Sequence, residues 1–182
     1  MKVILSPYNE KWQERFRSEA AHITDILGDN LLQIFHIGST SVPGLPAKPI
    51  IDIMPVLRNI EEIDGCTEAF ESLGYEVMGE FGMPGRRYMR KGGDNRTHQI
   101  HAFGYNSIAD ITRHLAFRDY LKSHPDICAA YAELKSQLAL LYPADIEAYS
   151  MGKDSFVKQA ERDALQWYWH LYPHTASPLN GV

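Results

Sequence analysis

Two short apolar segments on either side of a proline-containing loop constrain this chain more than any other feature. Residues 31–37 and 50–57 have the length and composition of strands, and residues 38–49 between them contain Pro43, Pro46 and Pro49. Proline lacks the backbone donor that helices and sheets need. A polyproline ligand is one alternative, but a position between two apolar segments favours a rigid internal loop. We therefore expect two strands of one sheet joined by an ordered loop.

This loop begins with the residues Gly38, Ser39, Thr40 and Ser41. Glycine allows backbone N–H groups to approach a ligand closely, and three hydroxyl groups add further donors. The pattern is suited to phosphate, although its spacing is not that of a P-loop. A tight turn without a ligand is the alternative.

A single aspartate, Asp52, lies inside the second apolar segment. Burying its carboxylate would cost several kcal/mol unless the group is paired or liganded. Two interpretations stay open: an ion pair with Lys48 or an arginine, or a metal ligand that faces the loop. Mg²⁺ typically binds through one or two carboxylates plus substrate phosphates. The period of two predicts that Met54 and Val56 share the face of Asp52.

The remaining patterns predict strands and helices first and helices alone afterwards. Further strands are expected at 75–78, 86–90 and 98–103, and helices at 7–28, 60–73, 110–123, 127–141 and 145–172. Glycines and asparagine between 90 and 98 predict a hairpin. We therefore expect an α/β protein with a mixed α+β sheet: a core at 1–109, a helical subdomain at 110–172 and a flexible tail at 173–182.

Composition narrows the class of protein. The chain has 182 residues, 45% of them hydrophobic, and a net charge of −5, so a basic nucleic-acid-binding surface is not expected. Neither a membrane span nor a signal peptide is expected, which predicts a cytoplasmic protein without membrane partners. Cys66 and Cys128 fit buried small residues in a reducing compartment.

Five segments resemble the GrpB-like proteins, the UPF0157 group, over most of the chain. They are residues 37–45 (IGSTSVPGL), 48–53 (KPIIDI), 96–101 (RTHQIH), 115–121 (LAFRDYL) and 131–135 (YAELK). The resemblance implies the nucleotidyltransferase fold of the polymerase-β type. A related domain fused to dephospho-coenzyme A kinases hints at nucleotide metabolism.

Within that superfamily, the resemblance implies that Gly38 and Ser39 contact a triphosphate and that Asp52 binds a metal. The second carboxylate is expected two residues later, where this chain has Met54. Two-metal phosphoryl transfer needs carboxylates for both ions. One Mg²⁺ or Mn²⁺ is therefore favoured over two, and nucleotide binding is better supported than catalysis.

Two histidines and several basic residues complete the candidate site. His98 and His101 are three apart on a predicted strand and so point to opposite faces, which argues against a shared metal. His101 is favoured as a phosphate donor or proton-transfer group, and a hydrogen-bonded structural histidine is the alternative. The predicted ligand-binding residues are Gly38, Ser39, Thr40, Ser41, Lys48, Arg96, His98, Arg118 and Lys135; the predicted catalytic ones are Asp52 and His101. A solvated surface charge is the alternative for each basic residue.

The leading hypothesis is a protein that binds a nucleoside triphosphate with Mg²⁺ and transfers a nucleotidyl group to a small acceptor. A non-catalytic module that binds a nucleotide or phosphometabolite is one rival, and an interaction scaffold with a decayed site is another. The acceptor, the base preference and any homo-oligomer stay open.

Overall fold

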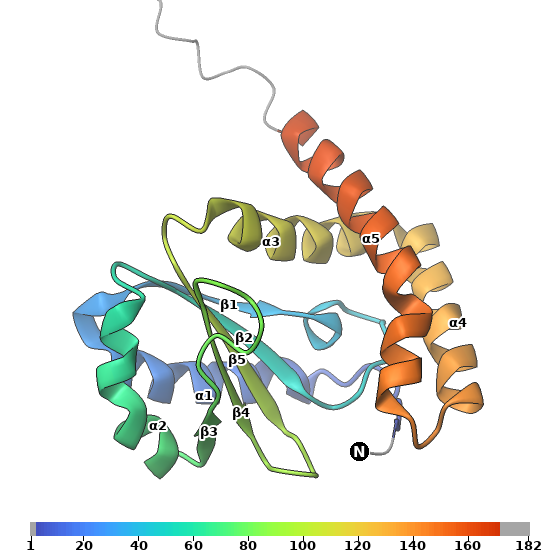
Figure 1. The fold of residues 1–182 in the computed structure, drawn as a ribbon. Helices are drawn as coiled ribbons and strands as arrows, with labels where there is room; N and C mark the ends of the chain where they lie inside the picture. The colour runs from blue at the N-terminus through green and yellow to red at the C-terminus, as the bar shows by residue number, and fades with distance from the viewer. Residues whose placement is uncertain (1–2, 172–182) are drawn as a thin grey trace, which may run out of the picture.

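The fold is a five-stranded mixed sheet with helices on both faces and at one end (Figure 1). The structure is a computed structural model that describes residues 3–171. The strands are β1 (Leu31–Ile37), β2 (Ile51–Leu57), β3 (Tyr75–Val77), β4 (Arg86–Lys91) and β5 (His98–Gly104). Their order is β1-β2-β5-β4-β3, and only the central β2–β5 pair among them is parallel.

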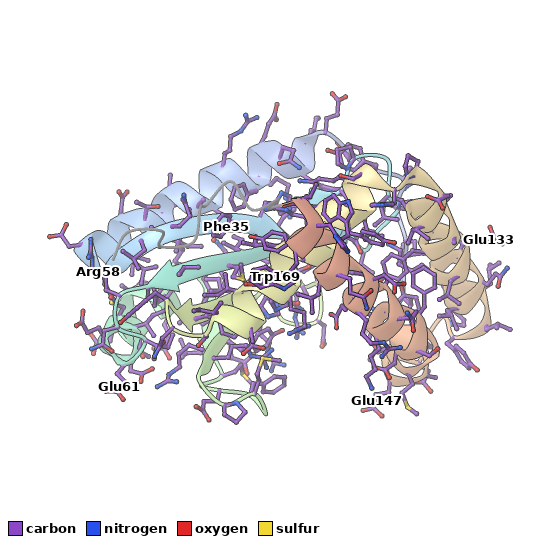
Figure 2. All side chains as sticks on the ribbon, turned by 90° about the horizontal axis from the view of Figure 1, so that it is seen from above. Phe35, Arg58, Glu61, Glu133, Glu147 and Trp169 are labelled. Atoms are coloured by element: carbon purple, nitrogen blue, oxygen red, sulfur yellow. The ribbon has the colours of Figure 1, made fainter. Side chains whose placement is uncertain are left out.

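Five α-helices surround this sheet. They are α1 (Lys11–Leu27), α2 (Thr67–Ser72), α3 (Ile108–Ser123), α4 (Pro125–Leu141) and α5 (Ile146–Leu171). Figure 1 shows α1 and α2 on one face, α3 on the other, and α4 with the first part of α5 at one end. Figure 2 shows Glu133 and Glu147, on α4 and α5, at the opposite end from Arg58 and Glu61.

The side chains of β2 alternate between the two faces of the sheet, and each face is covered by helices. Ile51 and Ile53 pack in the cluster that α1 covers, whereas Met54 packs with Phe103 in the cluster beneath α3. Both faces of this interior strand are therefore largely apolar, as expected for a strand covered on two sides. Asp52 is the one charged residue of β2, and it lies where the sheet meets the helices at one end of the molecule.

The predicted mixed α/β class is confirmed, and so are all five strands and the hairpin formed by β4 and β5. The segment predicted as one helix at 60–73 is instead a 3₁₀-helix, Glu61–Cys66, followed by the short α2. Gly65 lies at this junction, and glycine disfavours a continuous helix. Near the N-terminus, Ser6 forms an isolated bridge to Ala47. The predicted tail at 173–182 lies outside the described residues.

The division into a core at 1–109 and a helical subdomain at 110–172 stays a prediction. α3 packs directly on the sheet through Ile111 and Leu115. Within residues 3–171, no helix is long and apolar enough to cross a membrane.

Candidate functional site

A cavity of about 290 Å³ lies where the β1–β2 loop and the neighbouring ends of β2 and β5 meet the helices. It is lined by loop residues, by strand side chains and by residues of α3, α4 and α5. The polar ones are Ser39, Thr40, Lys48, Asp52, Gln99, His101, His114, Lys135, Tyr149 and Lys153. The sheet and the helical half thus contribute opposite walls of one pocket.

Gly38 allows the turn to pass directly over Asp52. Its φ is 70°, in the left-handed region that favours glycine. A Cβ atom at this position would overlap the Asp52 carboxylate. The close approach of backbone to carboxylate therefore requires glycine at position 38.

A buried histidine braces the turn from below. His36 stacks on Phe16 with ring centroids 4.8 Å apart, and its Nε2 lies 3.0 Å from Thr40 Oγ1. The Thr40 hydroxyl donates to the Ile50 carbonyl, 3.1 Å away, and the other ring nitrogen of His36, Nδ1, lies 3.3 Å from Gln13 Oε1. Burial lowers the pKa of His36 to about 4, which keeps the ring neutral at pH 7.

The hydroxyl groups of the turn have different roles. The Ser41 hydroxyl donates 2.6 Å to the Gly38 carbonyl, and the Thr40 hydroxyl is used as described above. These two groups hold the turn together. Ser39 Oγ instead accepts a hydrogen bond from Lys135 Nζ at 3.2 Å and lies on the cavity wall. Of the three hydroxyls, that of Ser39 is the one placed to meet a ligand.

Three lysines converge on the pocket. Burial lowers the pKa of Lys135 to about 7 and that of Lys48 to about 8, and in each case the charge of Lys153 lowers it further. Burial also lowers the pKa of Lys153. None of the three forms a salt bridge within the part of the chain that the structure describes, and Asp52 is the one carboxylate among the lining residues. The pocket therefore carries an excess of positive charge.

Two of these lysines repeat one arrangement on successive helices. Lys135 lies over the ring of Tyr131 on α4, with Nζ 4.7 Å from the centroid, and Lys153 lies over Tyr149 on α5 at 5.4 Å. In both pairs the tyrosine is four residues before the lysine, on the same helix face. The aromatic faces stabilise the ammonium groups where water is scarce.

Asp52 and His101 lie side by side, since His101 Nε2 is 3.4 Å from Asp52 Oδ1. The Nδ1 atom of His101 is buried without a hydrogen-bond partner in the described structure. On the far side of His101, the ring of His114 lies 5.9 Å away between centroids. The carboxylate thus lies beside the Nε2 edge of the imidazole at the cavity wall, while the Nδ1 edge is enclosed.

The structure brings most of the predicted site residues together, but four do not line the cavity. Ser41 only holds the turn, through its bond to the Gly38 carbonyl. His98 is on the opposite face of the sheet, where its pKa is lowered by burial and opposed by the charge of Glu19. Arg118 pairs with Asp119 and donates to the His36 carbonyl. Arg96 lines a separate cavity. The opposite faces of His98 and His101 follow from the alternation of β5.

Four polar residues of the cavity wall are not among the predicted site residues: Gln99, His114, Tyr149 and Lys153. The spacing of Tyr149 and Lys153 repeats that of Tyr131 and Lys135, so this repeat in the sequence is a pattern that could identify both residues as site candidates. Gln99 lies beside Asp52 in the parallel β2–β5 register. Its place depends on strand pairing, which the sequence pattern does not specify.

Replacing Gly38 by alanine is expected to disrupt the pocket. The added methyl group meets the Asp52 carboxylate, and alanine is strained at φ 70°. We expect a loss of stability of about 1–3 kcal/mol and loss of ligand binding, measured by urea denaturation and calorimetry. Gly44→Ala is the matched control, because Gly44 also has a positive φ (78°) but open space around it. Equal effects of both substitutions on binding would contradict the role of Gly38.

The geometry defines a mixed α/β protein with a lysine-lined pocket that contains one carboxylate. This chain belongs to the GrpB family, whose model, described as GrpB protein, matches residues 2–163. A crystal structure of the conserved protein GrpB from Enterococcus faecalis superposes with a TM-score of 0.89 at 48% identity, over 91% of this chain and 99% of that one.

Sequence relatives have the same family names. The chain is 46% identical to the UPF0157 protein YqkA of Bacillus subtilis over 91% of its length, but spans only 48% of YqkA. It is 31% identical to the glutamate-rich protein GrpB of Alkalihalophilus pseudofirmus, and there the alignment covers 87% of this chain and 93% of the relative. Structures of Cid1 align at 14% identity with a TM-score of 0.42, which is too low to transfer an activity.

Proposed function

We propose that this protein binds the phosphate tail of a nucleoside triphosphate in the lysine-lined pocket, together with one Mg²⁺ or Mn²⁺ at Asp52. The observation that carries the proposal is the convergence of Lys48, Lys135 and Lys153 on a cavity with one carboxylate. Buried ammonium groups without carboxylate partners are costly. A polyphosphate would supply the missing negative charge.

Bound phosphate also fits the lowered pKa values of the lysines. An anion beside Lys135, whose pKa is about 7, favours its protonated form. The protonated Lys135 then donates a charge-assisted hydrogen bond to the ligand, whereas without the anion only part of the Lys135 population is protonated near pH 7. Ser39 and the backbone of the Gly38 turn add neutral donors at the same wall.

The residues fit one divalent cation when phosphates are present. Asp52 offers carboxylate oxygens at the cavity wall, and Mg²⁺ commonly takes its other ligands from phosphates and water. Within residues 3–171 no group of three or more histidines, cysteines or acidic residues could hold a metal. We therefore assign the cation to Asp52 and the ligand jointly. When bound, it would neutralise phosphate charge.

Nucleotidyl transfer to a small acceptor is the reaction that we propose for this site. His101 would take the proton of an attacking hydroxyl group through Nε2, the atom beside Asp52 in a ring that lines the cavity, because Nδ1 is buried. Lys135 and Lys153 would stabilise the negative charge of the departing pyrophosphate. The fold that the GrpB resemblance implies is that of nucleotidyltransferases, which supports this choice.

The second candidate is a module that binds a nucleotide or phosphometabolite without transferring it. Met54 favours this candidate, because it is fully buried with Ile37 and Phe103 at the position where a second carboxylate is expected. A site with a single carboxylate assembles a two-metal centre less readily.

Calorimetric titration of ATP, GTP, CTP and UTP, with Mg²⁺ and with EDTA, tests the proposal. We expect Mg²⁺-dependent binding by the parent chain and about tenfold or greater weakening in Asp52→Asn, since a charged contact is lost. Asp25→Asn is the matched control, because Asp25 is exposed on α1. Unchanged Mg²⁺-dependent affinity in Asp52→Asn would refute the metal role. No binding of any nucleotide would leave the scaffold alternative.

A further inference from the structure

A second cavity, of about 360 Å³, adjoins the lysine-lined pocket. Lys48 and Ile50 line both cavities, so the two are neighbours. The second cavity is formed by four separate segments: Ile4 ahead of α1, the N-terminal part of α1 with Arg15, the end of the β1–β2 loop, and the β4–β5 loop with Arg96. Its volume is in the range of small-molecule sites.

This cavity also carries excess positive charge. Arg15, Lys48 and Arg96 line it together with one carboxylate, that of the exposed Asp94. Arginines elsewhere in the fold, such as Arg87 and Arg90, pair with carboxylates. Within residues 3–171, Arg15 and Arg96 form no ion pair.

Arg96 provides an independent observation. Its Nε atom is buried and has no hydrogen-bond partner among the described residues. A buried donor without a partner is uncommon in folded proteins and costs free energy. Arg96 nevertheless lines the cavity. The planar guanidinium group matches an oxyanion in two-point geometry, so its outer Nη groups would meet a phosphate there, while Nε stays enclosed by the protein.

Lys48 links the two cavities electrostatically. Burial is the largest cause of its lowered pKa, and the further charges that act on it include Lys153 of the first pocket and Arg96 of the second. Its ammonium group therefore lies in the field of both sets of cations. An anion in either cavity would favour its protonated form.

We propose that the second cavity binds a phosphorylated small molecule, whose phosphate contacts Arg96 and Arg15 on the side of Lys48 away from the first pocket. This molecule is the acceptor of the reaction, an assignment that rests on the proposed function. Its phosphate and the triphosphate would share Lys48 between them. Phosphate binding itself depends only on the second cavity.

The test is a titration of the full ¹⁵N-labelled chain with inorganic phosphate, followed by NMR. We expect saturable shifts of the backbone amides of Asn95 and Thr97, which line the second cavity. The Arg96→Gln substitution should weaken this binding about tenfold or more, because a charged donor pair is lost. Ser39 reports separately on the first pocket.

Arg58→Gln is the matched control, since Arg58 lies at the far end of the molecule (Figure 2). Arg15→Gln is a second variant with the same expected effect, and the dispersion of each spectrum shows whether the variant is folded. Absence of saturable shifts at Asn95 and Thr97, or equal affinity in both folded variants and the parent, would overturn the proposal. Saturation by acetate but not by phosphate would also overturn it.

Failure of the two proposals can be told apart. If phosphate causes saturable shifts of the Asn95 and Thr97 amide signals but no nucleotide shifts the Ser39 signal, the second site is supported and the nucleotide function is refuted. If a nucleotide shifts the Ser39 amide signal while phosphate leaves the Asn95 and Thr97 signals unchanged, the second site is refuted and the nucleotide function is supported.

Discussion

The Met54→Asp variant is expected to lose about 4–5 kcal/mol of stability rather than to gain a metal ligand. Met54 is fully buried and packs with Ile37 and Phe103 under α3. A carboxylate there would lie among apolar side chains without a cation. Since a domain of this kind is typically stable by 5–15 kcal/mol, the variant would be close to unfolding. Urea denaturation measures the loss.

Met54→Leu is the control for this substitution, because it conserves volume and should cost less than about 1.5 kcal/mol. The pair separates the effect of charge from that of shape. A Met54→Asp protein with the stability of the parent and a new Mg²⁺ dependence would show that position 54 reaches the pocket. That result would support a two-metal site.

Acid is expected to destabilise the protein through two buried histidines. Burial lowers the pKa of His36 to about 4 and that of His114 to about 3, both from an ordinary value of 6.5. The unfolded chain therefore takes up these protons first as the pH falls. Stability is fully present above about pH 6.5 and is lost as the pH falls from there to about 4 for His36 and to about 3 for His114. The His36 contribution is about 3 kcal/mol.

Urea denaturation at a series of pH values measures this effect. His36→Gln and His114→Gln should each flatten the dependence of unfolding free energy on pH by up to about 1.4 kcal/mol per pH unit. His22→Gln, exposed on α1, is the control. Profiles of both variants that run parallel to the parent would contradict the assignment to these histidines.

The sheet could be predicted because its signals are local. Alternation along residues 51–57 places Asp52 and Met54 on one face, and the structure has both on the face towards α3 and the pocket. The same rule separates His98 from His101. The two-residue period needs no knowledge of neighbouring strands.

The walls of the pocket could be predicted only in part, because they combine distant segments. Lys135 reaches Ser39 and the Pro46 carbonyl across about ninety residues of sequence. The family resemblance includes the segment that contains Lys135, whereas Lys153 is not among the predicted site residues although its spacing to Tyr149 is the same. Which hydroxyl of the Gly-Ser-Thr-Ser turn faces the cavity depends in part on the contact of Ser39 with Lys135, which is distant in sequence.

The parallel pairing of β2 with β5 has a consequence for synthesis of the chain on the ribosome. β2 ends at Leu57 and β5 ends at Gly104, so 47 further residues must be made before β2 has its second neighbour. At translation rates of about 5–20 residues per second, this takes roughly 2–10 s. During that time one edge of an almost wholly apolar strand is open to other nascent chains. The protein is therefore most vulnerable to aggregation while it is being made.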